Sequence, residues 1–178
     1  MKRFTVFLFC VIYGFGCGGE GEQKEQAGGG TGQALGDLTV TVPEGWVIET
    51  PSSQMRKAQY RLPGEGGDAE LAVTYFGKQG AGPVVANIDR WKKQFGHVSG
   101  NVMNLTVGGK KVTVLDISGT YAASMRPMGG GDKPKSNYRM LAAIVESPTG
   151  PYYFKLTGPK ETVGKWAGSF DRFLKSVH

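Results

Sequence analysis

The chain has 178 residues, of which 39% are hydrophobic and 20% are charged, and its formal net charge at pH 7 is +6. This composition suits one globular domain with short additional segments, and it excludes a chain that is disordered throughout. Both cysteines, Cys10 and Cys17, lie near the start, so the rest of the chain has no disulfide, no thiol nucleophile and no cysteine-based metal site. The histidines are His97 and His178, too few for a histidine-rich metal site. We therefore predict that the protein uses no metal ion and no cofactor.

The first residues have the pattern of a secretory signal. Lys2 and Arg3 precede an uncharged, mostly apolar run from Phe4 to Phe15. A transmembrane helix needs about 20 residues, so this run is too short to be retained as a membrane span. We predict that residues 1–16 are a signal peptide that is removed.

The end of this signal resembles the lipobox of bacterial lipoproteins, in which a lipid-modified cysteine becomes the first residue of the mature chain. Gly14 and Gly16 supply small residues before Cys17, although the family pattern prefers leucine where Gly14 stands and a small residue where Phe15 stands. The resemblance implies lipidation of Cys17 and attachment to a membrane. The alternative is an ordinary secretory signal that leaves Cys17 as a free thiol. Gly18 follows where inner-membrane lipoproteins usually carry aspartate, which favours the outer membrane.

Residues 17–36 have the composition of a spacer. The segment after Cys17 is rich in glycine, glutamate and glutamine, contains no aromatic residue, and has a single large aliphatic residue, Leu35. Such a segment cannot bury enough apolar surface to offset the entropy that it loses on ordering. We predict a flexible tether over residues 17–36 and a single globular domain over residues 37–178.

The hydrophobic pattern of this domain changes between the periods of strands and helices. Leu38–Val42 alternates as a strand, and Arg56–Leu62 and Glu70–Phe76 are predicted to pair as a hairpin around a glycine-rich loop. Between Pro83 and Phe95 the apolar residues recur every three or four positions, which predicts an amphipathic helix.

Two more hairpins and a closing helix are predicted in the second half of the chain. An apolar stripe after Gly158-Pro159 predicts an amphipathic helix up to Val177. Strand pairs joined by short turns favour an antiparallel sheet, and each such helix needs a sheet face to cover. The predicted fold class is α+β, with an antiparallel β-sheet of about six to seven strands flanked by two amphipathic helices. The hairpins are Asn101–Val107 with Lys111–Tyr121 around Gly108-Gly109, and Tyr138–Glu146 with Tyr152–Thr157 around a Ser-Pro-Thr-Gly turn.

In chain order these elements resemble the PsbP/Mog-like α/β/α sandwich over residues 37–178. The resemblance rests on VPEGW at 42–46, on ANIDRWKKQF at 86–95, and on the closing Phe170, Phe173 and Leu174. MLAAIVE at 140–146 and FKLTGPKETV at 154–163 also resemble uncharacterised bacterial envelope lipoproteins with a PsbP/Mog-like domain. No residue here matches the partner-specific residues by which PsbP supports oxygen evolution or Mog proteins bind the GTPase Ran. The resemblance implies a non-catalytic binding or accessory scaffold.

Two functions are compatible with these features. The first is a lipid-anchored, non-catalytic binding or accessory module of the bacterial cell envelope. The alternative is an envelope hydrolase that uses His97 with an unidentified partner residue. The positive net charge favours an anionic envelope component or an acidic protein face as partner. Export and the absence of a basic stripe interleaved with aromatic residues argue against nucleic acid.

The connection over residues 122–137 is the predicted partner-binding loop. It is longer than the about 2 to 5 residues that a hairpin loop needs. It combines soft apolar side chains, glycines and positive charge, and the alternative is an insertion without function. The candidate binding residues are Met125, Arg126, Met128, Lys133 and Lys135.

Two other segments resemble ligand loops only in part. Gly129–Ser136 has a proline where a phosphate-binding loop needs its second glycine, and a predicted strand follows it instead of a helix. Glu65, Asp68 and Glu70 lack the ligand spacing of a calcium-binding loop. We predict a solvated acidic turn there.

Overall fold

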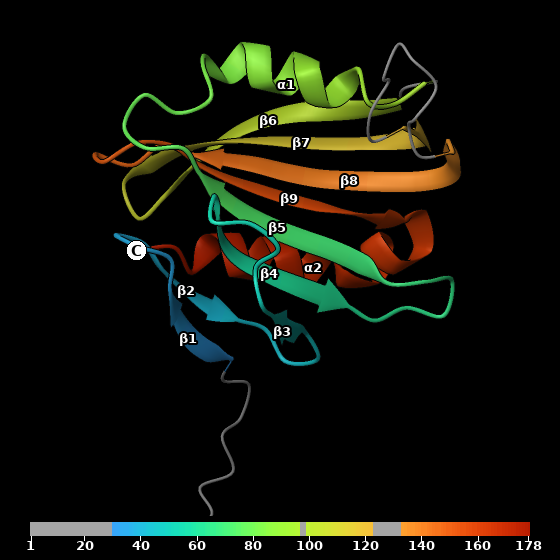
Figure 1. Ribbon diagram of the computed structural model, residues 1–178, viewed down its shortest axis with the longest axis horizontal. Helices are drawn as coiled ribbons and strands as arrows, with labels where there is room; N and C mark the ends of the chain where they lie inside the picture. Colours follow the sequence, from blue (N-terminus) through green and yellow to red (C-terminus); the bar gives the residue numbers. More distant parts are fainter. Residues whose placement is uncertain (1–29, 97–98, 123–132) are drawn as a thin grey trace, which may run out of the picture.

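The computed structural model describes residues 30–96, 99–122 and 133–178. Within these residues, seven strands form one antiparallel sheet in the order β3-β4-β5-β9-β8-β7-β6, and β1 pairs with β2 in a separate hairpin. The two helices pack on opposite faces of the sheet (Figure 1). The elements are β1 (Thr31–Ala34), β2 (Thr39–Val42), β3 (Val47–Glu49), β4 (Arg56–Leu62), β5 (Ala69–Tyr75), α1 (Val84–Lys92), β6 (Ser99–Val107), β7 (Lys110–Tyr121), β8 (Lys135–Val145), β9 (Tyr152–Pro159) and α2 (Lys160–Lys175).

Helix α2 and the β1–β2 hairpin cover one face of the sheet with apolar side chains. Alternate residues of a strand point to the same face, so Tyr60 of β4 and Phe154 of β9 both meet Phe173 of α2, with ring centroids 5.6 and 5.8 Å apart. The ring centroid of Trp46 lies 5.0 Å from that of Phe173. All four side chains are buried, and the larger hydrophobic cluster of the described residues lies on this face.

Helix α1 covers only part of the opposite face. Ile88 and Trp91 of α1 pack against Leu115 of β7 and Met140 of β8. Phe95, just beyond the helix, belongs to the same cluster, and its ring centroid lies 5.2 Å from that of Tyr121 of β7. The helix runs above β6, β7 and β8, and among the described residues no helix lies over this face of β4 and β5 (Figure 1).

The predicted α+β fold is confirmed. The strand predicted over Arg56–Leu62 has the predicted bounds, and the three predicted hairpins pair as antiparallel ladders. Gly108 and Gly109 have φ angles of 52° and 75° at their turn, which glycine adopts without a Cβ clash. The sequence does not predict β3, because its three residues are too few to show an alternating pattern.

The ordered domain begins before the predicted boundary at residue 37. Residues 31–34 of the predicted tether form β1, which pairs with β2. Leu35, the single large aliphatic residue of that segment, is 1% exposed because it packs into the cluster beneath α2. The predicted tether therefore extends too far by residues 31–36, and residues 17–29 lie outside the described part of the chain.

The predicted loop over residues 122–137 also extends too far. Strand β8 begins at Lys135, which pairs with Tyr121, so residues 135–137 belong to the sheet. A register shift between Gly119 and Tyr121 and a φ angle of 57° at Asn137 accompany this extension of the ladder. The sequence does not reveal it, because Lys-Ser-Asn lacks the alternating apolar residues of a typical strand.

Candidate ligand-binding groove

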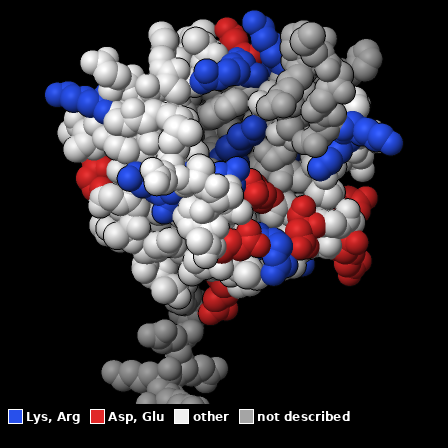
Figure 2. All heavy atoms as spheres, viewed as in Figure 1, with Lys and Arg blue, Asp and Glu red and all other residues white. Residues whose placement is uncertain are grey.

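The part of the sheet that α1 leaves uncovered carries polar and charged side chains. On β4, β5 and β9, the residues that alternate with the buried core positions point to this side. Figure 2 shows acidic and basic side chains close together on this face. Two hollows of about 370 and 470 Å³ lie here, and both are lined by Arg56, Ala72 and Lys155.

We call the two hollows together the α1 groove. The smaller one, the helix pocket, lies against α1, and Phe76, Asn87, Arg90, Trp91 and Tyr153 also line it. The larger one is named the tyrosine pocket, and Glu70, Tyr121, Lys135, Tyr138 and Thr157 also line it.

Arginines of β4 hold the acidic residues beside the groove. Arg56 Nη1 donates a hydrogen bond to Glu70 Oε1 at 2.9 Å. Arg61 contacts Asp68 Oδ2 at 3.0 Å through Nη1 and Glu49 Oε1 at 3.2 Å through Nε. The hydrogen bond from Arg61 holds the pKa of Asp68 below its ordinary value. These carboxylates are therefore compensated by cations of the same sheet.

Lys155 is the cation at the junction of the two pockets. Its Nζ donates to Gln94 Oε1 at 2.7 Å and to the Tyr121 hydroxyl at 3.4 Å, and none of the ion pairs between described residues involves it. Burial lowers the pKa of Lys155 to about 8; the charge of Glu70 opposes this shift and that of Arg56 adds to it. At neutral pH, Lys155 is therefore mostly a cation whose hydrogen-bond partners are neutral.

The wall of the helix pocket is fixed by hydrogen bonds. Asn87 is 1% exposed, and its Nδ2 donates to the carbonyl oxygens of residues 81–83 at 2.9 to 3.3 Å. Its Oδ1 accepts a hydrogen bond from Arg90. The Tyr153 hydroxyl accepts a hydrogen bond from the Ala81 backbone N–H at 2.8 Å. The loop before α1, the helix and β9 are thus tied together around the pocket.

Aromatic rings form the apolar part of the same wall. The Tyr153 ring centroid lies 5.5 Å from that of Phe76 and 6.3 Å from that of Trp91. Phe76 is 42% exposed, whereas Trp91 and Tyr153 are buried. With Arg56, Arg90 and Lys155 also lining it, the helix pocket combines aromatic surface with positive charge, and none of its described lining residues is acidic.

The tyrosine pocket has a mixed charge. The rings of Tyr121 and Tyr138 are stacked with centroids 5.9 Å apart, and Lys135 Nζ lies 5.5 Å from the centre of the Tyr138 ring. The Thr157 hydroxyl is buried and has no hydrogen-bond partner among the described residues. Buried hydroxyls usually have a partner, so this atom marks an unsatisfied position in the wall of the groove.

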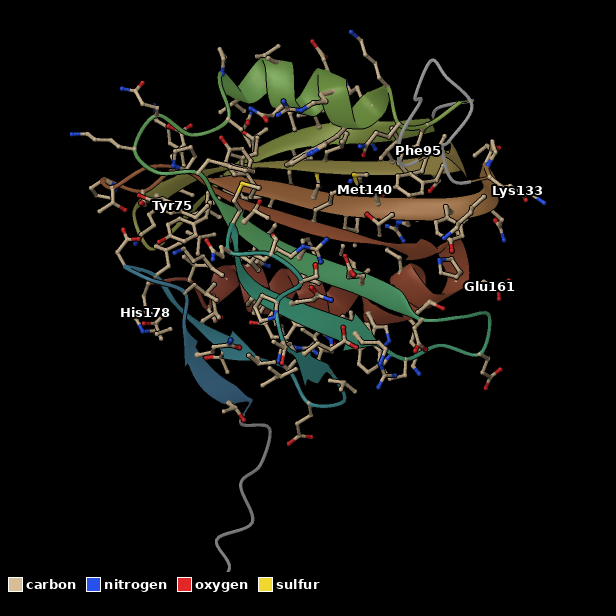
Figure 3. The ribbon with its side chains drawn as sticks, viewed as in Figure 1. Tyr75, Phe95, Lys133, Met140, Glu161 and His178 are labelled. Carbon is tan, nitrogen blue, oxygen red and sulfur yellow. The ribbon has the colours of Figure 1, made fainter. Side chains whose placement is uncertain are left out.

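The structure describes few of the site residues predicted from the sequence. Lys133 and Lys135 are exposed, and Figure 3 shows Lys133 beside the start of β8. Of these two, Lys135 lines the tyrosine pocket. Cys17, His97 and residues 123–132, which include Met125, Arg126 and Met128, lie outside the described residues.

The main groove residues, Arg56, Arg90 and Lys155, are absent from the predicted site. Lys155 gives the only usable signal, because it stands between Phe154 and Leu156 and is the one charged residue of its strand. A lysine inside such a run points to a strand face that is not covered by the core. In the sequence, Arg56 and Arg90 have the pattern of ordinary surface residues, and only the fold places both of them in the lining of one pocket.

Two kinds of feature are absent from the ranges 30–96, 99–122 and 133–178. Their histidine, cysteine, aspartate and glutamate side chains do not gather into a group of three or more that could hold a metal ion. None of their helices is both long enough and apolar enough to cross a membrane.

In the segment predicted as an acidic turn, the Asp68 carboxylate accepts a hydrogen bond from the Gly64 backbone N–H at 3.2 Å.

Comparisons with known proteins support the fold. No protein-family model matches the sequence, and no curated protein sequence matches it. Among solved structures, the chain is similar to cyanobacterial PsbP (CyanoP) from Synechocystis sp. PCC 6803, with a TM-score of 0.54 and 14% identity over 92% of this chain and 96% of that chain. It is also similar to the protein of unknown function PA94 from Pseudomonas aeruginosa, with a TM-score of 0.50 and 14% identity over 84% of this chain and 96% of that chain. At this level of identity the likeness concerns the fold alone, and the chain has a PsbP-like α+β fold.

Proposed function

We propose that this protein is a lipid-anchored, non-catalytic binding module of the bacterial cell envelope, and that the α1 groove is its ligand site. The observation that carries the proposal is the groove itself. It lies on the part of the sheet that α1 leaves uncovered, and cations and aromatic rings from separate elements converge there.

The cost of burying Lys155 supports a role in binding. Lys155 stands in a strand whose neighbouring residues, Phe154 and Leu156, are each 0% exposed. Partial burial of an ammonium without a carboxylate partner is unfavourable, and its lowered pKa reflects that cost. Groups with such a perturbed pKa are concentrated at functional sites.

The proposed anchor is Cys17, with residues 18–30 as spacer between the lipid and β1. A glycine-rich segment of this length has an r.m.s. span of about 20 Å. In Figure 1, β1 and β2 lie at the opposite side of the sheet from α1. An anchor that precedes β1 is therefore attached at a distance from the α1 groove, which leaves the groove accessible to a dissolved ligand.

The anchor is tested by mass spectrometry of the mature N-terminus. We expect the chain to begin at Cys17 with a diacylglyceryl group, and we expect a Cys17→Ser variant to lose membrane attachment. A free thiol at Cys17, or a mature chain that begins elsewhere, would contradict this part of the proposal.

The groove is tested by analysing small molecules that co-purify with the full chain. Ala72→Phe places a ring where the two pockets meet, and Val85→Phe is the matched control, because Val85 on α1 is 70% exposed. A compound that is enriched with the wild type and with Val85→Phe but lost with Ala72→Phe would support the proposal. If a co-purifying compound is retained equally by both variants, provided both melt as the wild type does, the α1 groove is not the ligand site.

A further inference from the structure

The helix pocket offers positive charge that the protein does not itself neutralise. Of its three cations, Arg56 is paired with Glu70. Arg90 bonds to the neutral amide of Asn87, and Lys155 bonds to a neutral amide and a phenol. Among the described residues, neither Arg90 nor Lys155 forms an ion pair. Arg90 is exposed to solvent, whereas Lys155 is partly buried, so the charge that lacks a counter-ion inside the pocket is that of Lys155.

The walls beside these cations suit an apolar group. The edge-to-face rings of Phe76 and Trp91 against Tyr153 make a continuous aromatic surface, and Phe76 is partly exposed at the pocket. Ligand sites typically combine such apolar walls with a few polar groups that fix orientation. The volume of about 370 Å³ lies within the range of about 300 to 1,000 Å³ that small-molecule sites occupy.

We infer that the helix pocket binds a small organic acid, whose carboxylate pairs with Lys155 and Arg90 while its aromatic or aliphatic body lies against Phe76, Trp91 and Tyr153. This inference rests on the proposed function, since it names the class of ligand for the same groove. It concerns the helix pocket only, which is the half of the groove without an acidic lining residue.

A carboxylate fits this pocket better than a doubly charged phosphate. The Glu70 carboxylate pairs with Arg56 Nη1 at 2.9 Å beside the pocket. A second negative charge on the ligand would be repelled by this carboxylate. Arg90 is already oriented by Asn87, which leaves the compact ammonium of Lys155 as the main counter-charge. One ammonium and one oriented guanidinium match a single bidentate carboxylate.

A membrane surface is a poor occupant of this pocket. The rings and the cations line a hollow between α1 and β9, and a flat array of lipid headgroups cannot enter it. The pocket also lies on the side of the sheet opposite β1, and hence opposite the proposed anchor (Figure 1). A dissolved acid can reach it.

The test is isothermal titration of the full chain in mild detergent at pH 7, with a detergent blank and with chosen probes. The first probe, 3-phenylpropionate, has an acid group and an aromatic body. The other probes are 3-phenylpropanamide, which lacks the charge, acetate, which lacks the body, and phenyl phosphate, which can carry two charges. We expect 3-phenylpropionate to bind about ten-fold or more tightly than the amide or acetate, since a charge-assisted hydrogen bond contributes about that factor.

Matched variants locate the binding. Lys155→Met removes the ammonium and keeps the length of the side chain. It should therefore weaken the binding of 3-phenylpropionate about ten-fold and leave the binding of the amide unchanged. Lys175→Met is the control, because Lys175 lies on α2 in an exposed pair with Asp171. Ala72→Phe, which fills the space beside Lys155, should block the acid without removing a charge.

Several results would overturn the inference. It fails if the amide binds as tightly as 3-phenylpropionate, if Lys155→Met binds the acid as the wild type does, or if phenyl phosphate binds more tightly than the carboxylate. A neutral compound co-purifying in the α1 groove would overturn the organic-acid assignment and leave the proposed binding function intact. If no compound co-purifies with the wild type and no probe binds to it, both the organic-acid assignment and the proposed binding function are wrong.

Discussion

The two faces of the seven-stranded sheet differ most clearly on β9. Phe154 and Leu156 point to the α2 side and are fully buried in the larger core. Lys155 and Thr157 point to the other side, where they line the α1 groove. One strand therefore supplies packing on one face and polar groups on the other, through the two-residue period of its side chains.

This difference indicates how the fold can carry a groove. On the α2 side, the helix and the β1–β2 hairpin exclude water from the central strands, and aromatic rings pack in contact. On the other side, α1 covers only the half of the sheet near β7 and β8. Because the covered face supplies most of the apolar burial, the uncovered half can hold charged groups that cost stability.

The largest expected effect comes from breaking the covered face. Phe173→Ala removes the ring that contacts Trp46, Tyr60 and Phe154. Truncation of a buried phenylalanine costs about 3 to 5 kcal/mol, a large part of the about 5 to 15 kcal/mol by which a domain is stable. We expect a much lower melting temperature and a lower urea midpoint.

The matched change on the other face is Val85→Ala, on the exposed side of α1. It should shift the melting temperature by no more than a degree or so, about the size expected for an exposed position. If Phe173→Ala has the same melting temperature as this control, the α2 face does not hold the fold together, and the comparison between the faces is wrong.

The strands and the two helices that pack on them were the part that the sequence could predict. The strands alternate apolar and polar residues, and the helices repeat apolar residues every three or four positions, so local periodicity carries the information. The sequence does not predict β1, because TGQA has no large apolar residue and the strand is held by backbone pairing with β2. Its place in the fold depends on Leu35, whose burial no local pattern indicates.

The groove could not be predicted in the same way. Arg56, Arg90 and Lys155 come from β4, α1 and β9, and each is a single residue in its own segment. Their meeting depends on β5 pairing with both β4 and β9, with Ala72 opposite Lys155. The sequence predicts the hairpins but contains no local signal for the β5–β9 pairing, because those strands are far apart in the chain.

The next effect, with the opposite sign, comes from the uncovered half. Lys155→Met replaces a partly buried ammonium with an apolar side chain of similar length. The lowered pKa corresponds to a cost of about 3 kcal/mol at pH 7, and the variant loses two hydrogen bonds of about 1 kcal/mol each, so it should be more stable than the wild type by about 1 kcal/mol. The urea midpoint measures this gain. A substitution that stabilises the fold while weakening the binding of an organic acid would show that Lys155 serves the groove.

The pH dependence of this gain has a definite sign. The pKa of Lys155 is about 8 in the folded chain, below the 10.5 of the free side chain. Between these values the unfolded chain binds more protons, so the wild type becomes relatively more stable as the pH rises from about 8 to 10.5. The advantage of Lys155→Met should shrink over that range, and an advantage that does not change with pH would contradict the assigned titration. The groups that face Lys155 or lie near it are Glu70, Arg56, Arg90, Gln94, Tyr121, Lys135 and Tyr138.

The smallest expected effect concerns the attachment of the β1–β2 hairpin to the covered face. Asp37, between β1 and β2, accepts hydrogen bonds from the hydroxyls of Tyr152, Thr149 and Ser147 around the β8–β9 turn. Burial raises the pKa of Asp37, but these hydrogen bonds outweigh it, and the pKa lies below the ordinary 3.8. The pKa of Tyr152 is raised to about 12 by burial and by the same carboxylate.

A carboxyl group whose pKa is lower in the folded chain stabilises the fold above its unfolded pKa, and this contribution is lost as the pH falls through the folded value. Asp37→Asn should therefore lower the stability at pH 7 by about 0.5 kcal/mol, the scale of an exposed interaction. The difference from the wild type should disappear as the pH falls below 3.8. Asp171→Asn is the control, since Asp171 is an exposed carboxylate paired only with Lys175 in the described residues. Should both variants show the same pH dependence in urea titrations, Asp37 would not fasten the hairpin to the sheet.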